Sequence, residues 1–178
     1  MDGTFEGPAT EGGKICVVLL NPSSSDQPTV SVKNVERVIP RLGFGSFEIV
    51  NLVDIPTKNS KSLAAVANTP EIWLGARNEL TDALARADDL LFGWGHAPLQ
   101  GPANGLKRMQ TLWLYAEAER LGHTHAWMMN GLPRHPSRWH QYVGPQRGLI
   151  SGGDFATRAV AMLDRWPMRG LLAGHQDD

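Results

Sequence analysis

The sequence contains a single cysteine, Cys16, so no disulfide can form within the chain. Cys16 stands inside an apolar run, which predicts a buried thiol rather than a nucleophile. No apolar run approaches the roughly 20 residues that span a bilayer, and the first residues are Gly-rich and acidic. These absences predict a cytoplasmic protein without a signal peptide or a membrane partner.

An excess of charge of either sign is also lacking. Lys and Arg total 17 and Asp and Glu total 18, so the net charge is -1. A chain of this charge has no global attraction to duplex DNA, and any nucleic-acid contact must depend on a local patch. The balance favours a small or single-stranded ligand over a long duplex contact.

Apolar segments of strand length alternate with segments of helical period. Strands are predicted at residues 14–20, 47–53, 89–94 and 126–129. Helices are predicted between them, at 29–42, 71–87 and 106–121, the last with Met109, Leu112, Trp113 and Ala116 on its apolar face. This alternation predicts a three-layer α/β/α fold with a four-stranded parallel sheet in the order 2-1-3-4.

The chain length and its 42% hydrophobic residues fit one domain with a core of its own. We expect residues 1–13 to form a flexible leader, 14–166 a single α/β domain and 167–178 a C-terminal tail. Within the domain, residues 151–166 are expected to form a last helix.

Polar, turn-rich loops follow all four predicted strands. In an open parallel sheet these loops gather at one edge, where ligands bind near the point at which the strand order reverses. The residues at the strand ends are Asn21, Asn51, Gly95 and, in the last loop, His135. We therefore expect these residues to share one crevice.

Four motifs lie at these strand ends, and together they resemble a known family. They are LLNPSSSD (19–26), GFGSFEIVNLVD (43–54), LLFGWG (90–95) and GLPRHP (131–136). The combination resembles the domain-of-unknown-function family 1643 of bacteria and phages, over roughly residues 15–142. The biochemical role of that family is unsettled, so this resemblance supplies no reaction.

The same motifs are similar, at a greater distance, to the uracil-DNA glycosylases. Those enzymes share the arrangement of four parallel strands and carry a water-positioning loop, which Asn21-Pro22 matches. Their second strand ends in an Asn that reads the base edge, which Asn51 resembles, and their third ends in an apolar-Trp-Gly segment like 92–95. Their His-Pro-Ser motif stands here at 135–137. The resemblance implies a DNA glycosylase, a hydrolase that binds DNA or a nucleotide.

Hydrolysis of a base–sugar bond imposes its own requirements on a site. The sugar acquires oxocarbenium-like character, so water must be positioned and the departing base stabilised. We expect Asn21 to orient the water and His135 to hydrogen-bond the departing base. The most active uracil glycosylases carry a carboxylate directly before the proline of this loop; here Asp26 or Asp54 would have to replace it, and we expect Asp26 to be catalytic.

The remaining site residues are expected to read the base or hold a phosphate. They are Pro22, Ser23, Ser24, Asn51, Asp54, Lys58, Trp94, Gly95, Arg134, Ser137 and Arg138. Structural roles are the alternatives: helix capping for 23–26, a turn tie for Asn21, loop packing for His135, a core position for Trp94 and a solvated rim for the cations.

The sequence therefore favours a uracil-DNA-glycosylase-like protein that recognises a nucleobase and hydrolyses an N-glycosidic bond in a modified nucleotide or in DNA. The alternatives are a non-catalytic nucleotide or nucleic-acid binding module and an enzyme of phage-type base modification. The expected partner is a nucleotide or single-stranded or flipped-base DNA. We expect no cofactor, and Gly43-Phe44-Gly45 lacks the third glycine of a dinucleotide fingerprint. We also expect no metal, because His123 and His125 alternate along a strand and would diverge.

Overall fold

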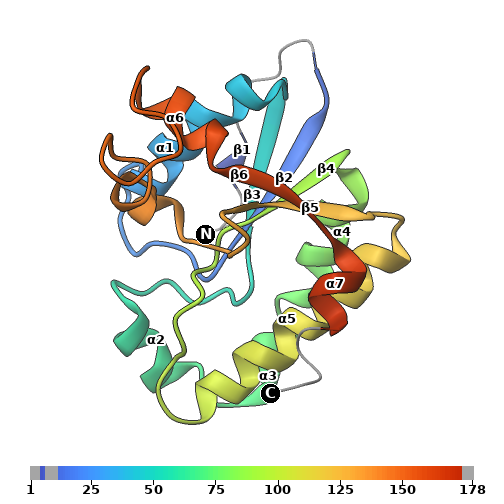
Figure 1. The fold of residues 1–178 in the computed structure, drawn as a ribbon. Coiled ribbons are helices and arrows are strands. Elements are labelled where there is room, and N and C mark those ends of the chain that lie inside the picture. The colour runs from blue at the N-terminus through green and yellow to red at the C-terminus, as the bar shows by residue number, and fades with distance from the viewer. Residues whose placement is uncertain (1–4, 7–11, 174–178) are drawn as a thin grey trace.

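A mixed six-stranded sheet forms the centre of the fold, in the order β1-β3-β2-β4-β5-β6 (Figure 1). The structure is a computed structural model that describes residues 5–6 and 12–173. The strands are β1 (Phe5–Glu6), β2 (Lys14–Leu19), β3 (Ser46–Asn51), β4 (Asp89–Phe92), β5 (His125–Met129) and β6 (Leu163–Pro167).

The four predicted strands are parallel and adjacent in the predicted order, as β3-β2-β4-β5. The sheet is larger than the predicted four strands, because β1 pairs with β3 and β6 pairs with β5, both antiparallel. The predicted helix over 151–166 ends early, since β6 follows directly after α6 (Phe155–Ala161). Four of the five β6 residues are exposed, so this edge strand has no apolar run to reveal it.

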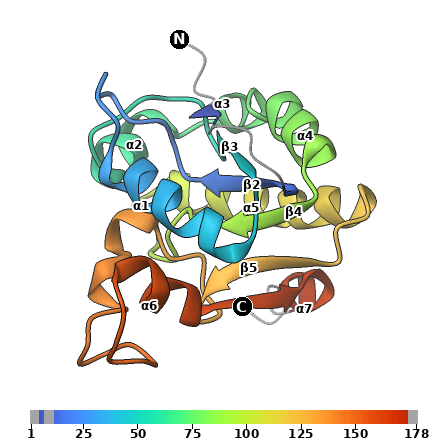
Figure 2. The ribbon, with the colours of Figure 1, turned by 90° about the horizontal axis from the view of Figure 1, so that it is seen from above.

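Helices cover both faces of the sheet. They are α1 (Val30–Val38), η1 (Ile39–Leu42), α2 (Ser60–Val66), α3 (Pro70–Leu74), α4 (Arg77–Arg86), α5 (Pro102–Arg120), η2 (Pro136–Gln141), α6 and α7 (Met168–Ala173). In Figure 2, α1 and α6 lie in front of the strands and α5 behind them. Buried side chains of α1, η1, η2 and α6 form one core on the first face, and those of α2–α5 and α7 form a second core on the other.

The long helix predicted over 71–87 is two helices, α3 and α4. Pro70 lacks an N–H group and starts α3 as its first residue, and Gly75, with its low helix propensity, follows its end. Trp73 of α3 is buried, and its indole donates to the Ala67 carbonyl at 3.0 Å. This bond holds α3 against the end of α2, a helix that the sequence did not predict.

The predicted tail begins inside the fold. Pro167 is the last residue of β6, and Met168, at the start of α7, is buried while its N–H donates to the Thr124 carbonyl at 2.8 Å. Residues 174–178 lie outside the described part of the chain, as does most of the predicted leader. Across the described ranges, every helix is too short or too polar to cross a membrane.

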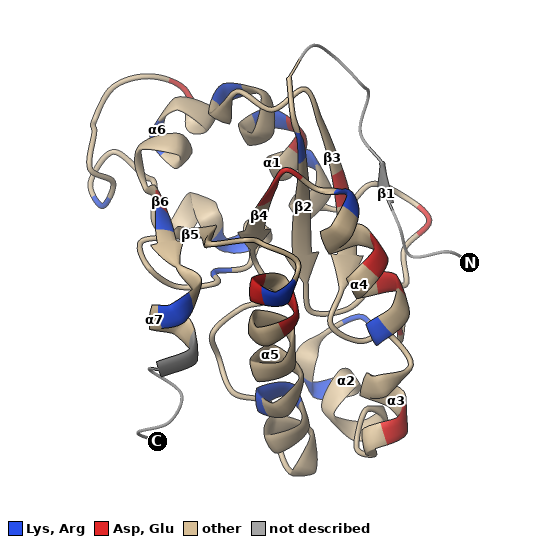
Figure 3. Cartoon of the chain, turned by 90° about the vertical axis from the view of Figure 1, so that its right-hand side faces the viewer, with Lys and Arg blue, Asp and Glu red and all other residues tan. Residues whose placement is uncertain are grey.

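Charged residues of both signs occur along α4 and α5 (Figure 3). One acidic residue, Glu48, is buried and pairs with a residue of α4. Glu48 of β3 is 1% exposed and pairs with Lys14 at 2.7 Å and with Arg86 at 2.6 Å. Burial by itself would raise the pKa of Glu48, but the hydrogen bonds from Arg86 and Lys14 outweigh it and lower the pKa below the ordinary 4.5. This cluster ties β2, β3 and α4 together.

We expect Glu48→Gln to lower the free energy of unfolding by about 1.5–3 kcal/mol, the range for hydrogen bonds to a charged group. Because the folded-state pKa is depressed, the loss is complete near neutral pH and shrinks as the pH falls below 4.5. Urea unfolding at two pH values measures it, with the exposed Glu36→Gln as the matched control. An equal effect of both variants at pH 7 would contradict this role.

Candidate functional site

A crevice of about 1380 Å³ opens at the carboxyl ends of the parallel strands. The arrowheads of β2 and β5 point to this same edge in Figure 2. The predicted site residues that line it are Asn21, Pro22, Ser23, Ser24, Asp26, Asn51, Lys58, Trp94, Gly95, Arg134, His135, Ser137 and Arg138. The strand-end residues therefore share one crevice, as the strand order predicts.

Asp54 does not belong to this group. It is exposed and is not among the residues that line the crevice, and it follows the buried Leu52 and Val53. The chain has left the sheet edge at this point and directs the carboxylate to solvent. Of the two carboxylates expected to serve the site, Asp26 alone lines the crevice.

The Asn21 side chain joins the loops that follow β2 and β3. Its Nδ2 donates to the carbonyls of Pro22 and Ile55, at 2.9 and 3.1 Å, and lies 3.0 Å from the Thr57 hydroxyl. Two carbonyls around this atom identify it as the amide nitrogen. Asn21 therefore ties the turn, and its Oδ1, which bonds no described residue, is left to accept a hydrogen bond at the crevice.

The loop 23–26 after β2, here called the serine loop, is a series of local turns rather than a helix cap. Ser23 Oγ accepts from the Ser25 N–H at 3.1 Å, and Ser25 Oγ accepts from the Gln27 N–H at 3.2 Å. The cap of α1 is Thr29, whose hydroxyl accepts from the Val32 N–H. The capping alternative for 23–26 is therefore wrong, and these hydroxyls stand at the exposed mouth of the crevice.

Asn51 reaches the crevice because of its position in β3. It pairs with Leu19 in the parallel register. Because alternate residues of a strand point to the same face of the sheet, Asn51 is on the face of Phe47 and Ile49, which belong to the core on the α1 face. The strand ends here, so its half-buried amide faces the crevice rather than that core. Gln110 of α5 supports the following turn, since its Nε2 donates to the Leu52 carbonyl at 3.0 Å.

His135 is held by its Nδ1 atom. The Ser137 hydroxyl lies 2.9 Å and the Ser31 hydroxyl 3.4 Å from Nδ1, which also accepts from the Ser137 N–H at 3.4 Å as the cap of η2. Asn34 of α1 donates to the Pro136 carbonyl at 2.8 Å and fixes η2 against α1. Because Nδ1 accepts from a backbone N–H, the neutral ring carries its proton on Nε2.

Burial, followed by the positive charges of Arg138 and Lys107, lowers the pKa of His135 from 6.5 to about 4. The imidazole is therefore neutral at pH 7, and its Nε2–H bonds no described residue. The arrangement gives the crevice a fixed, uncharged hydrogen-bond donor that changes little between pH 5 and 8.

A ¹H–¹⁵N titration of the histidine rings is expected to show His135 neutral, with its proton on Nε2, from pH 8 down to pH 5, and protonated only near pH 4. Loss of the signal in His135→Gln assigns the resonance. A midpoint near the ordinary 6.5 would contradict the buried, neutral state described here.

Lys107 of α5 was not predicted as a site residue, yet it lines the crevice and is only 7% exposed. Its Nζ donates to the carbonyls of Gly95 and Ala97, at 2.7 and 2.9 Å, and so fixes the loop after β4. Burial lowers the pKa of Lys107 to about 8, which leaves the ammonium charged at pH 7. Within the described part of the chain, no carboxylate pairs with it.

The buried face of α5 differs from the predicted one. Met109 is 53% exposed and Ala116 is also exposed, whereas Lys107, Gln110 and Leu114 are buried. The apolar pattern identified the wrong face because the helix turns a polar stretch toward the site, where its side chains bond backbone carbonyls. The sequence signal for this buried polar face was the pair Lys107 and Gln110, three residues apart on one helix.

Arg134 stacks on an aromatic ring that the sequence did not single out. Its guanidinium carbon lies 3.9 Å from the centroid of Tyr142, which also lines the crevice. Its Nε is buried and has no hydrogen-bond partner. Trp94, by contrast, is 4% exposed, and its ring centroid lies 4.7 Å from that of Phe92, so it is a core aromatic.

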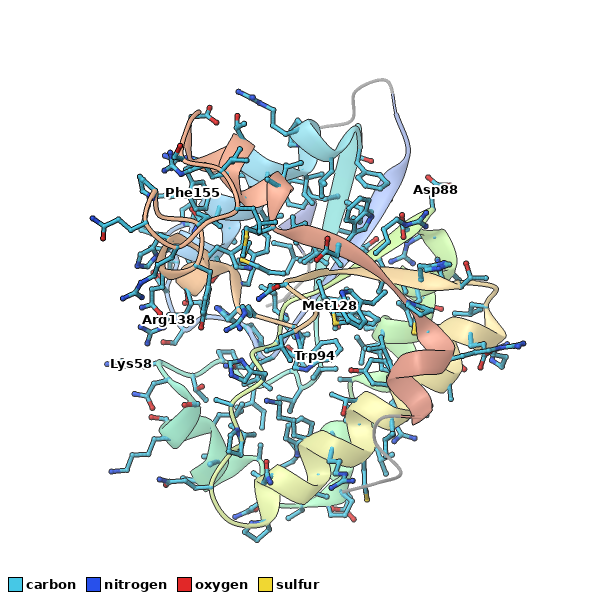
Figure 4. The ribbon with its side chains drawn as sticks, in the orientation of Figure 1. Lys58, Asp88, Trp94, Met128, Arg138 and Phe155 are labelled. Carbon is cyan, nitrogen blue, oxygen red and sulfur yellow. The ribbon has the colours of Figure 1, made fainter. Side chains whose placement is uncertain are left out.

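The crevice is much more positive than the chain as a whole. Its charged lining residues are Asp26, Lys58, Lys107, Arg134 and Arg138, a net charge of +3. Figure 4 shows Lys58 and Arg138 at the same end of the molecule, on the loop before α2 and on η2, while Asp88 lies at the opposite end. The local patch that an anionic ligand requires is therefore present.

The candidate metal ligands His123 and His125 make separate contacts. His123 Nε2 lies 2.8 Å from the Leu84 carbonyl, and His125 Nδ1 lies 2.9 Å from the Thr124 hydroxyl. Cys16 is fully buried in β2, and burial raises the pKa of its thiol. These three residues are placed by structural contacts and do not line the crevice.

Comparison with known proteins adds a family but no activity. No curated protein and no solved structure matches the chain. A family model described as "Protein of unknown function (DUF1643)" matches residues 7–137, which include all four parallel strands and the loops that form the crevice up to Ser137. The matched segment covers most of the chain, and the protein belongs to this family.

Proposed function

We propose that the protein binds a nucleobase-containing ligand in the crevice and hydrolyses its N-glycosidic bond, as a uracil-DNA-glycosylase-like hydrolase. One observation carries the proposal: an acceptor, Asn21 Oδ1, and a neutral donor, His135 Nε2–H, belong to the same positively charged crevice. Asn21 is fixed through its Nδ2 atom and His135 through its Nδ1 atom. Preorganised groups of this kind favour a transition state in which charge develops.

The two groups fit opposite sides of the reaction. Asn21 Oδ1 accepts a hydrogen bond from water and directs an oxygen lone pair toward the anomeric carbon. As the C–N bond breaks, its electron pair moves to the base, and His135 donates to the base oxygen that gains charge. The water proton passes to Asp26 or to solvent, the departing base anion takes up a proton from solvent, and the products are a free base and a sugar hydroxyl.

The cations supply the phosphate contacts. Lys58 and Arg138 are exposed at the mouth of the crevice, and Arg134 is held on Tyr142. Salt weakens phosphate contacts of this type, because bound counterions are released when the phosphate binds. Asn51, with both a donor and an acceptor, is suited to read the edge of a pyrimidine.

Lys58→Ala and Arg134→Ala should each weaken binding of a single-stranded oligonucleotide and reduce its salt dependence by about one phosphate contact. Fluorescence anisotropy at two salt concentrations measures both quantities. Lys33→Ala, on the exposed surface of α1 and outside the crevice, is the matched control. Unchanged affinity and slope in the two crevice variants would assign these cations to a solvated rim.

The reaction itself is tested with oligonucleotides that carry uracil, hydroxymethylated and other modified bases. Incubation with the protein followed by alkaline cleavage reveals abasic sites, and chromatography of matching free nucleotides reveals released base. Release of one class of base supports the hydrolase. Its absence across the panel rejects the hydrolase.

One observation favours a second candidate, the non-catalytic binding module. Asp26 is exposed on the serine loop and forms no hydrogen bond or ion pair with a described residue, so nothing fixes it as a general base. A crevice that binds its ligand without cleaving it needs no such base. Measurable binding that depends on Asn51 without base release would identify this module. An enzyme of base modification stays a third proposal, on the same crevice.

A further inference from the structure

The buried ammonium of Lys107 bears on which ligand the crevice accepts, a question that the proposed function leaves open between DNA and free nucleotides. Lys107 is 93% buried, and its charge faces two backbone carbonyls rather than a carboxylate. A buried charge without a counter-ion is costly, because water no longer solvates it. An anion from the ligand would complete the environment.

The donor count around Lys107 also leaves room for a ligand. The ammonium has three protons, and the carbonyls of Gly95 and Ala97 accept two of them. Arg134 contributes a second unsatisfied cationic donor, since its Nε is buried and bonds nothing. Both residues line the crevice, and each has an N–H group that no described acceptor meets.

The position of Lys107 distinguishes it from the other cations. Lys58 and Arg138 are exposed and can meet a phosphate that stays in solvent, as in the backbone of a strand. Lys107 is buried against the loop 95–97, where its Nζ bonds the backbone carbonyls. Its positive charge is close enough to His135 to lower the pKa of that ring. A phosphodiester in a continuous strand is flanked by sugars on both sides, whereas a terminal phosphate can enter a crevice end first. A neutral base would leave the ammonium unpaired.

We propose that the inner part of the crevice is a phosphate subsite centred on Lys107 Nζ, and that the ligand is a nucleoside monophosphate that inserts its terminal phosphate there. This inference rests on the proposed function for the nucleobase and adds the class of substrate. Arg134 lines the same crevice and brings a second positive charge to it. The exposed cations then guide the anion toward the mouth.

Calorimetry tests the subsite with defined probes: the 5′-monophosphates of the common deoxynucleosides and of deoxyuridine, each against its own nucleoside, and inorganic phosphate. The wild-type protein is expected to prefer at least one monophosphate over its nucleoside by about 10- to 100-fold, the factor for a charge-assisted hydrogen bond. Lys107→Met should abolish most of that preference, measured as the ratio of monophosphate to nucleoside affinity in the same variant. Lys107→Arg should retain part of it, and Lys33→Met all of it.

If Lys107→Met does not fold, an experiment on the wild-type protein alone still tests the proposal. In the wild-type protein, inorganic phosphate should compete with the monophosphate and leave nucleoside affinity unaltered. Absence of this competition, no preference for any monophosphate, or a preference that survives in Lys107→Met each overturns the subsite. Loss of the preference in Lys58→Met but not in Lys107→Met moves the phosphate to the mouth and overturns it as well.

Base release is recorded in the same samples, which separates the two proposals. Binding that depends on Lys107 without release of base rejects the hydrolase and retains the subsite. Release of base from oligonucleotides, with no effect of Lys107→Met on the preference for a monophosphate, rejects the subsite and retains the hydrolase.

Discussion

Replacing His135 with alanine should lower the rate of base release by about 100- to 1000-fold, the usual cost of removing one preorganised donor to developing charge. The effect should fall on kcat, because Nε2–H strengthens its bond only as the base departs. Single-turnover assays with a base that the wild-type protein releases measure the change. Binding of the uncleaved ligand should weaken only modestly.

His135 also caps η2, so a structural effect must be separated from a chemical one. His135→Asn is the matched variant, because an Asn oxygen can accept from the Ser137 N–H and keep the cap while removing the Nε2 donor. We expect His135→Asn to unfold at nearly the wild-type temperature and to release base as slowly as His135→Ala. Activity that returns with the cap would assign His135 a structural role alone.

The second large effect is expected at Asn21, again about 100- to 1000-fold on base release, by the same comparison with a lost transition-state contact. Thr57→Val is the control, since it removes the Thr57 hydroxyl that contacts Asn21 Nδ2 and leaves Oδ1 in place. A slow Asn21→Ala beside a nearly normal Thr57→Val supports orientation of water by Oδ1. Equal losses in the two variants would contradict it and indicate that only the turn tie matters.

Asn51→Ala is expected to act on binding rather than on the bond-breaking step. It should weaken ligand affinity by about 1–3 kcal/mol and blur the choice of base, the cost of leaving buried polar partners unsatisfied. Anisotropy titrations across bases measure both effects. A variant that binds every base as the wild-type protein does would remove Asn51 from base recognition.

The central sheet and the crevice were predictable because their signals are local. Strands buried on both faces require continuous apolar runs, and their loops must meet at one edge once the strands are parallel. Asn21 and His135 come to one crevice from positions more than a hundred residues apart for this reason. β6 escaped prediction because an exposed edge strand needs no apolar run.

Lys107 and Tyr142 escaped prediction for a different reason. Burial of a lysine is decided by the carbonyls that meet its ammonium, and those of Gly95 and Ala97 are fixed by the fold rather than by nearby sequence. Tyr142 becomes part of the crevice only when η2 carries it beside Arg134. Asp54 shows the converse, since closeness in sequence to a strand end did not bring it to the site.

The most direct test of the central claim is detection of free base by mass spectrometry. The panel of modified oligonucleotides and nucleotides is incubated with the wild-type protein and, separately, with the Asn21→Ala/His135→Asn double variant. The account predicts one released class of base with the wild-type protein and none above background with the double variant. No base released by the wild-type protein from any substrate, or equal release by both proteins, would contradict it.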